Sequence, residues 1–287
     1  MTSKPRLVTF VLLPMLCACG GKDASGPVPA PAPAAPTWKM DFFDDFETFD
    51  EASWQDQILW VNNEHQCYLR GGELGTREVS DGTLKLRVIN VGEPRPCDNL
   101  SKLGEKHPDT PYVSGRIASK NLKEFAGGRW TARLRVLDSG QDGMFPAWWL
   151  LGARNNEPPV QEEDENVCWP LPGSGEIDIF EHHANGGPEH YVSRIIESQG
   201  RCDGGDWETH QKTLKANLRE FHEYSVEWRG EDLVFAVDGT EVAHVPGRAS
   251  DFQEPMFAIL NFAKINEAPM EGAWVMEVDS VRHESLQ

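Results

Sequence analysis

The sequence predicts an all-β sandwich of antiparallel sheets, and three features lead to this prediction. Several segments alternate apolar and charged residues with a period of two, as Leu84, Leu86 and Val88 do around intervening Lys and Arg residues. Tight-turn pairs such as Asp238-Gly239 follow such segments. Long stretches with the period of an amphipathic helix are absent from the sequence. This combination is typical of antiparallel sheets that bury one face.

The same alternation marks further strands and bounds the domain. It recurs in residues 131–136, 233–237, 242–244 and 274–278. Residues 39–287 are long enough for one large sandwich, since single sandwiches reach about 200 to 250 residues. The sequence has no visible internal repeat and no second linker, so we expect a single folded domain over 39–287.

The amino terminus has the pattern of an export signal. A basic start, Met1–Arg6, precedes the mostly apolar Leu7–Leu16, which is too short to span a bilayer as a helix. Leu16–Cys19 resembles a bacterial lipobox, so we expect residues 1–19 to be a lipoprotein signal peptide with Cys19 lipidated. By resemblance to bacterial lipoproteins, Gly20 favours the outer membrane. An ordinary secretory signal peptide is the alternative.

Residues 20–38 are expected to form a linker. Most of this segment is a tract of proline and alanine that cannot build a core. In polyproline geometry such a tract holds a domain about 40 Å from its anchor.

Cysteine usage agrees with export. Of six cysteines, two lie in the leader. The remaining four are Cys67, Cys97, Cys168 and Cys202. An oxidising compartment favours pairing, and we expect Cys67–Cys97 and Cys168–Cys202 because each bond closes a loop beside strands. Unpaired buried thiols are the alternative. A zinc site is not expected, because no short Cys-x-x-Cys spacing occurs.

The charge of the chain restricts its partners. Without Lys4, Arg6 and Lys22 the 27 basic residues fall to 24, and without Asp23 the 46 acidic residues fall to 45, which leaves a net charge of −21. Such a field excludes nucleic acid as a ligand and disfavours sulfated polysaccharides. A neutral polysaccharide fits better.

Three carboxylates, Glu176, Asp178 and Glu181, stand on one short β-branched and aromatic run. In a regular strand Glu176 and Asp178 share a face while Glu181 points the other way. A β-bulge near Ile179 or Phe180 would return Glu181 to that face. Retaining glycoside hydrolysis needs two carboxyl groups about 5 to 5.5 Å apart, so this run predicts a catalytic strand. The alternative is a charged, solvated edge strand.

At this point the chain resembles glycoside hydrolase family 16, whose signature in the bulged form is Glu-x-Asp-x-x-Glu. Further matching blocks, in the order of the family, are Tyr112–Ile117, Phe145–Leu150, Phe221–Trp228, Val237–Gly239 and Pro255–Ala263. The resemblance implies a concanavalin A-like jelly-roll β-sandwich of two curved antiparallel sheets. It also implies that Glu176 is the nucleophile, Glu181 the general acid/base and Asp178 the carboxylate between them.

Substrate-binding candidates come from the aromatic residues and from family position. Aromatic faces suit the apolar faces of sugar rings, and Trp149 and Trp169 are the leading candidates, with Trp148 behind them because large aromatics are more often core. Asn62 and Arg116 match positions that bind sugar hydroxyls in the family. Arg116 could equally be a structural arginine paired with an acid.

No cofactor is expected for catalysis, but the resemblance implies a candidate structural calcium. Asp45 and Asp279 lie at the strands where family members bind this ion, and calcium takes six to eight oxygen ligands. In so acidic a chain a coincidental pair is the alternative.

Two departures from the family leave the linkage specificity open. Many of its β-1,3-glucanases carry a histidine on the strand after the catalytic one and a Gly-Gly late in the chain, where this chain has Arg194–Ser198 and Ala263–Asn266. Residues 92–111 and 155–167 are expected to rim the cleft, and loops set specificity.

The whole pattern predicts an exported, monomeric, retaining endo-acting β-glucanase, attached to the membrane only by a lipid anchor. Its expected substrate is a β-1,3 or mixed β-1,3/1,4 glucan. The alternatives are an agarase-like or carrageenase-like galactan hydrolase, an envelope transglycosylase and a non-catalytic surface glycan-binding protein.

Overall fold

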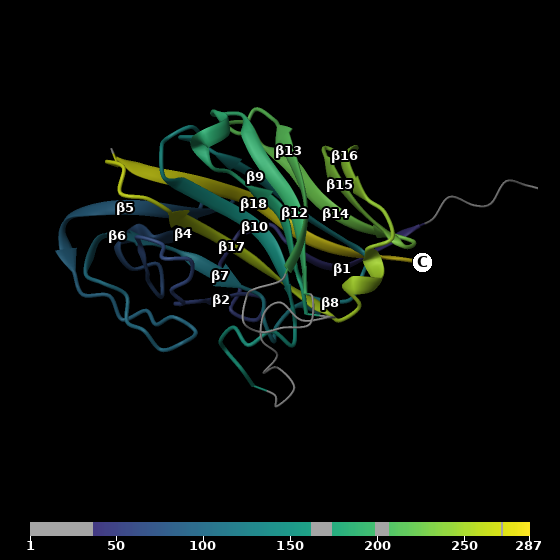
Figure 1. The fold of residues 1–287 in the computed structure, drawn as a ribbon, viewed down its shortest axis with the longest axis horizontal. Helices are drawn as coiled ribbons and strands as arrows, with labels where there is room; N and C mark the ends of the chain where they lie inside the picture. Colours follow the sequence, from purple (N-terminus) through teal and green to yellow (C-terminus); the bar gives the residue numbers. More distant parts are fainter. Residues whose placement is uncertain (1–36, 162–173, 199–206, 271) are drawn as a thin grey trace, which may run out of the picture. The chain divides into compact units, whose positions relative to one another are not determined.

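The computed structural model describes residues 37–161, 174–198, 207–270 and 272–287. The chain divides into the units Met1–Ala35 and Pro36–Gln287, and the second unit contains all of the described residues. Two β-sheets dominate this second unit, as the strand prediction expects (Figure 1). Its described helices are the short 3₁₀ turns η1 (Glu73–Gly75), η3 (Ala184–Gly186) and η4 (Ala249–Asp251). Within the described ranges, no helix has the length and apolar character needed to cross a membrane.

The larger sheet has ten strands and is called sheet A. Its order is β16-β15-β14-β9-β18-β5-β6-β3, with β1 also paired to β18 and β4 to β5. The strands are β1 (Trp38–Asp44), β3 (Cys67–Tyr68), β4 (Arg77–Ser80), β5 (Thr83–Arg95), β6 (Thr110–Ser114), β9 (Arg129–Val136), β14 (His222–Arg229), β15 (Asp232–Val237), β16 (Thr240–Val245) and β18 (Ala273–Leu286). The pairing is antiparallel except between β3 and β6, which are parallel.

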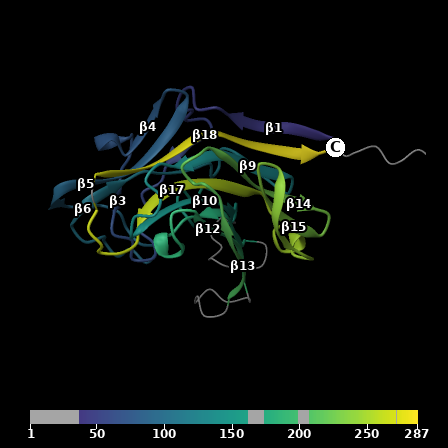
Figure 2. The same cartoon turned by 90° about the horizontal axis from the view of Figure 1, so that it is seen from above.

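The smaller sheet, sheet B, has eight strands in the order β13-β12-β11-β10-β17-β7-β2, with β8 paired to β17. The strands are β2 (Gln55–Asp56), β7 (Arg116–Ala118), β8 (Glu124–Phe125), β10 (Met144–Gly152), β11 (Glu176–Glu181), β12 (His190–Ser198), β13 (Trp207–Lys215) and β17 (Met256–Lys264). Seen from above, β1, β9 and β18 of sheet A lie in one layer and β10, β12 and β17 of sheet B in another (Figure 2).

The main core lies between the two sheets and uses the predicted apolar faces. Leu84, Leu86 and Val88 of β5 are fully buried in it, as the alternation predicts. The turn between β15 and β16 is also as predicted, because Asp238 and Gly239 both have positive φ, 49° and 74°. That pair of conformations matches the twist of a two-residue hairpin.

Trp148 belongs to this core, so its prediction as a substrate-binding residue is wrong. Its side chain has 0% exposure, and its ring lies 6.2 Å from the ring of Trp130 on sheet A. Adjacent residues of a strand point to opposite faces. Trp148 therefore faces the inter-sheet core, while its neighbour Trp149 faces the other side of sheet B.

Candidate active site

A β-bulge in β11 brings the three acidic side chains into one place. Toward β10, Asp178 pairs with Trp149 and Phe180 with Trp148, so Ile179 is the additional residue. Toward β12 the register also shifts between Asp178 and Glu181. The bulge predicted near Ile179 or Phe180 is therefore present, and it returns the later carboxylate to the face of the earlier two.

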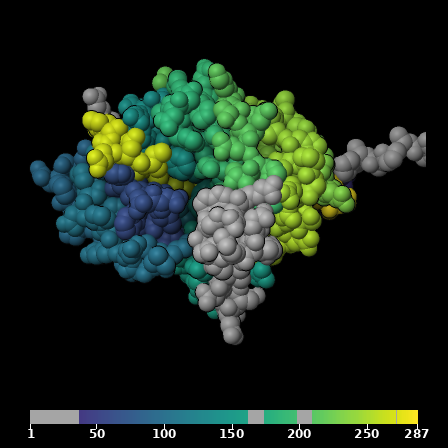
Figure 3. Space-filling view, viewed as in Figure 1, coloured from purple at the N-terminus to yellow at the C-terminus, as the bar shows by residue number. Residues whose placement is uncertain are grey.

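These carboxylates line a cavity of about 520 Å³ on the face of sheet B that points away from the core, here called the acidic cleft. Its walls come from β7, β10, β11, β12 and β17 and from the segments 60–64 and 101–105. In the space-filling view, the blue region of β4 to β6 lies at the left of the visible face, and the green to yellow-green region of β12 to β16 lies at its top and right (Figure 3). Glu176 is partly exposed in the cleft, whereas Asp178 and Glu181 are buried.

Burial and mutual repulsion raise the pKa of all three carboxyl groups. Burial, with Glu181 nearby, raises the pKa of Glu176 to about 7, although a hydrogen bond with Asp178 opposes the rise. Burial and the charge of Asp178 raise the pKa of Glu181 to about 8. Burial and Glu176 raise the pKa of Asp178 well above its ordinary value. Asp178 and Glu176 share a hydrogen bond, and the three groups titrate as a coupled set.

Arg194 on β12 supplies a positive charge beside these acids. Its Nε and Nη2 both donate to Oε2 of Glu181, the Nε bond being 2.7 Å long. The same Nε lies 2.9 Å from Oδ2 of Asp178. The charge of Asp178, and then that of Glu181, raises the pKa of Arg194 against the effect of burial.

Trp149 is held at the cleft by a chain of hydrogen bonds. Its indole Nε1 donates to Oδ1 of Asn261 (2.8 Å), and Nδ2 of Asn261 donates to the hydroxyl of Tyr68 (3.1 Å). The guanidinium of Arg116 lies 5.0 Å from the Trp149 ring. The partly exposed indole is therefore held in place by hydrogen bonds and lines the cleft, and its role as a sugar platform stays a prediction.

Arg116 lines the acidic cleft but serves as a buried ion-pair partner. Its Nη2 lies 2.7 Å from Oε2 of Glu157, and its Nε donates to Oε1 of Gln57 (2.6 Å). Its side chain is only 1% exposed. Of the two interpretations of Arg116, the geometry favours the structural one, because these partners already use the guanidinium.

Of the other predicted site residues, one lines the acidic cleft, two lie away from it and the rest fall outside the described ranges. Asn62 is exposed and lines the acidic cleft, with φ of 53°. Asp279 is paired with Arg133 at 2.9 Å, and no group of three or more His, Cys, Asp or Glu side chains in the described part of the chain could hold a metal. The carboxylate of Asp45 accepts a bond from the backbone N–H of Glu47 (3.4 Å). Trp169, Cys168 and Cys202 lie outside the described residues.

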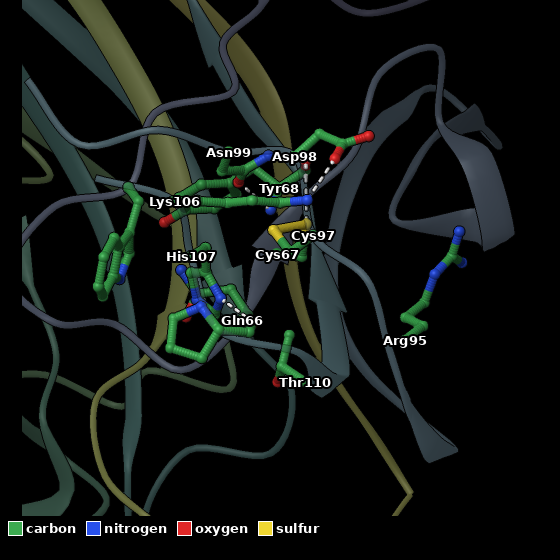
Figure 4. Close-up of a disulfide and its surroundings, with 12 residues drawn as sticks. Gln66, Cys67, Tyr68, Arg95, Cys97, Asp98, Asn99, Lys106, His107 and Thr110 are labelled. Carbon is green, nitrogen blue, oxygen red and sulfur yellow. Dashed lines mark hydrogen bonds and ion pairs between the residues drawn. A yellow bond between two sulfur atoms is a disulfide. The ribbon is translucent and has the colours of Figure 1, made fainter. Parts of the chain in front are cut away.

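The predicted Cys67–Cys97 disulfide is present (Figure 4). It joins the start of β3 to the loop after β5. From there the chain reaches the hairpin 101–105, closed by a bond from the N–H of Ser101 to the carbonyl of Glu105 (2.8 Å). Leu103 at its tip lines the cleft and is 88% exposed. The expectation that 92–111 rims the cleft is therefore confirmed for this hairpin.

Sequence reasoning missed several cleft residues. Glu64 is 5% exposed, and burial raises its pKa to about 7. Glu157 lies in the segment 155–167 that was expected to rim the cleft, but its ion pair with Arg116 was not predicted, and Asn261 was not among the predicted site residues. Glu64 carried a detectable signal, since it stands two residues after the predicted Asn62.

The two packed, almost wholly antiparallel sheets form a jelly roll of the concanavalin A type. The chain belongs to glycosyl hydrolases family 16, whose sequence model matches residues 62–265.

Known relatives agree with this membership. The chain is 26% identical to the β-glucanase of Rhodothermus marinus, covering 93% of this chain and 85% of that protein. It is 28% identical to glucan endo-1,3-beta-glucosidase A1 of Niallia circulans, covering 75% of this chain but only 29% of that protein. The crystal structure of LamAcat from Zobellia galactanivorans matches with a TM-score of 0.70 at 28% identity, covering 85% of this chain and 96% of that one.

Proposed function

We propose that this protein is an endo-acting β-glucanase that cleaves β-1,3 or mixed β-1,3/1,4 glucan with retention of configuration. Glu176 attacks the anomeric carbon while Glu181 gives its proton to the leaving glycosidic oxygen. Glu181 then takes a proton from water, and that water displaces Glu176 from the glycosyl carbon. Asp178 keeps Glu176 oriented through their shared hydrogen bond.

The observation that carries this proposal is the bulge, which places all three carboxylates in one cleft. The effect of Asp178 on the other two acids supports the assigned roles. Burial raises the pKa of both, but Asp178 lowers the pKa of Glu176 through a hydrogen bond and raises the pKa of Glu181. The nucleophile can thus be ionised while the acid still holds its proton, which is the division of labour that the mechanism needs.

A neutral substrate is supported by the charges of the cleft. Six acidic residues line it, against the three cations Lys102, Arg116 and Arg194. Lys102 and Arg116 both lie beside Glu157, at 3.6 and 2.7 Å. Such a cleft repels polyanions. The relatives named for β-glucan substrates, and a serine variant of Zobellia galactanivorans LamA solved with laminaritriose and laminaritetraose (27% identity, TM-score 0.71), favour a glucan over a galactan.

We also propose that the protein is exported and acts as a monomer tethered through a lipidated Cys19. The Cys67–Cys97 disulfide supports export, since such bonds persist in oxidising compartments. Metabolic labelling with a radioactive fatty acid, compared between the full chain and its Cys19→Ala variant, tests the anchor.

The activity is tested with residues 37–287 on laminarin, mixed-linkage glucan, agarose and carrageenan, measuring reducing ends with Glu176→Gln as control. Release from a glucan, lost in the variant, is the expected result. NMR of the first product should show the β-anomer. Lengthened products in the presence of an acceptor sugar would indicate a transglycosylase, and binding without cleavage of any polysaccharide would contradict the proposal.

A further inference from the structure

Arg194 differs from the other two cations of the acidic cleft in what it contacts. Lys102 and Arg116 are both engaged with Glu157, at the side of the cleft. Arg194 instead contacts Asp178 and Glu181, two of the three carboxylates on the bulged strand. Its side chain is 23% exposed and lines the cleft.

The bulge explains how one arginine reaches both acids. Arg194 stands directly opposite Asp178 in the register of β11 and β12, whereas Glu181 stands opposite Val192. The register shift shortens the path from Arg194 to Glu181, which a regular strand would place on the other face. On its far side Arg194 pairs with Gln211 of β13, so its backbone is fixed between two strands.

The contacts restrict the orientation of the Glu181 carboxyl. Nε and Nη2 of Arg194 both donate to Oε2, the Nε bond being 2.7 Å long, and these are the bonds that the carboxyl accepts from described residues. Both donors belong to one planar guanidinium of fixed geometry and converge on a single oxygen, so Arg194 sets the position of Oε2, while Oε1 receives no bond from the described residues.

The charge of Arg194 also acts on Glu181 during proton transfer, when that carboxyl becomes negative. When Glu181 gives its proton to the leaving oxygen it becomes an anion, so a fixed cation beside it stabilises the transition state more than the ground state. Its charge and hydrogen bonds lower the pKa of Glu181 against burial and the charge of Asp178, which raise it. Glu176 on the same strand interacts with Glu181 as well, while Ala147 of β10, opposite Glu181, does not titrate.

We propose that Arg194 is a positioning residue for proton transfer: it holds Oε2 of Glu181 so that Oε1 is presented to the glycosidic oxygen, and its charge stabilises the ionised carboxylate that the transfer leaves. This inference rests on the proposed hydrolase function, since it assigns a role within that reaction. It adds to that function a role for Arg194 in setting the pH at which Glu181 loses its proton.

The test compares Arg194→Met and Arg194→Lys with the wild type and with Arg229→Met. Arg229 is the control because it is 54% exposed and pairs with Glu227 and Glu241 on sheet A. With laminarin, Arg194→Met should lower kcat at least about 10-fold with KM within about threefold, because the lost interaction belongs to the transition state. The alkaline limb of its kcat/KM profile should move up by about one pH unit or more, since removing a cation raises the pKa of a carboxyl.

The lysine variant separates charge from geometry. Arg194→Lys should keep the alkaline limb near that of the wild type but recover kcat only in part, because an ammonium group lacks the planar two-donor contact. Arg229→Met should change neither quantity. An Arg194→Met enzyme that is folded by circular dichroism but keeps the wild-type kcat and pH profile would overturn the proposal.

A measurement without substrate distinguishes this inference from the proposed function. NMR of protein labelled with ¹³C-glutamate follows the titration of Glu181 directly, assigned through Glu181→Gln. If the wild type cleaves no glucan, the hydrolase proposal fails, but a higher titration midpoint in Arg194→Met would still support the electrostatic role of Arg194. Equal midpoints in both proteins would refute that role.

Discussion

Replacing the proposed nucleophile, Glu176→Gln, should make the protein more stable at alkaline pH. Burial raises the pKa of Glu176 from an ordinary 4.5 to about 7. A carboxyl whose pKa is raised on folding favours the folded state while it is protonated. That contribution is complete below pH 4.5 and is lost as the pH rises through 7. Glutamine has nearly the same shape and never ionises, so it avoids the loss.

The size of the effect follows from the same two values. A difference of about 2.5 pKa units corresponds to roughly 3 kcal/mol at pH 8 if the whole of it acts on stability. Because Glu176 is partly exposed, solvent screening reduces this to about 1 to 2 kcal/mol. For a domain of this size that is a rise in Tm of roughly 2 to 8 °C at pH 8. At pH 4.5 the two proteins should unfold at nearly the same temperature.

Thermal and urea unfolding at pH 4.5 and 8 provide the measurement. Glu223→Gln is a matched control of opposite sign, because the hydrogen bond from Arg282 lowers the pKa of Glu223. This control should not stabilise the protein at pH 8. If Glu176→Gln is no more stable than the wild type at pH 8, or differs from it equally at both pH values, the argument from burial is wrong.

Four further predictions concern the cleft and its supports. The wild-type kcat/KM should follow a bell-shaped pH profile with its maximum near neutral pH, since the nucleophile must be ionised and the acid protonated. Trp149→Ala should raise KM for laminarin roughly 5- to 10-fold by removing an aromatic platform, and Asn261→Ala should raise it less. Arg116→Met should lower the free energy of unfolding by about 3 to 5 kcal/mol, and adding Glu157→Gln should restore much of the loss in urea unfolding, because the single variant leaves a buried charge unpaired. Cys97→Ser should cost about 2 to 4 kcal/mol in the same assay, from a bond with a sequence separation of 30.

The sequence was most informative where a local pattern carries the structure. The spacing of Glu176, Asp178 and Glu181 predicted the bulge because a period-two strand cannot place all three on one face. The alternation in β5 and the Asp238-Gly239 turn were predicted for the same kind of reason. These features depend on neighbours along the chain.

The sequence was least informative where partners meet across sheets or loops. The adjacent Trp148 and Trp149 must face opposite sides, but which of them enters the core depends on the orientation of the whole of β10 in sheet B. The pairing of Arg116 with Glu157, and the reach of Arg194 to Glu181, depend on register and on long-range packing. Composition alone carries neither kind of information.

The bulge at Ile179 means that the site is compatible with a catalytic strand one residue shorter. Deletion of Ile179 would leave Glu181 two positions after Asp178, so a regular strand would still place the three carboxylates on one face. The loss would fall on the core, where the side chain of Ile179 is 1% exposed. A single-codon deletion there should therefore lower the stability of the protein more than it displaces the acid.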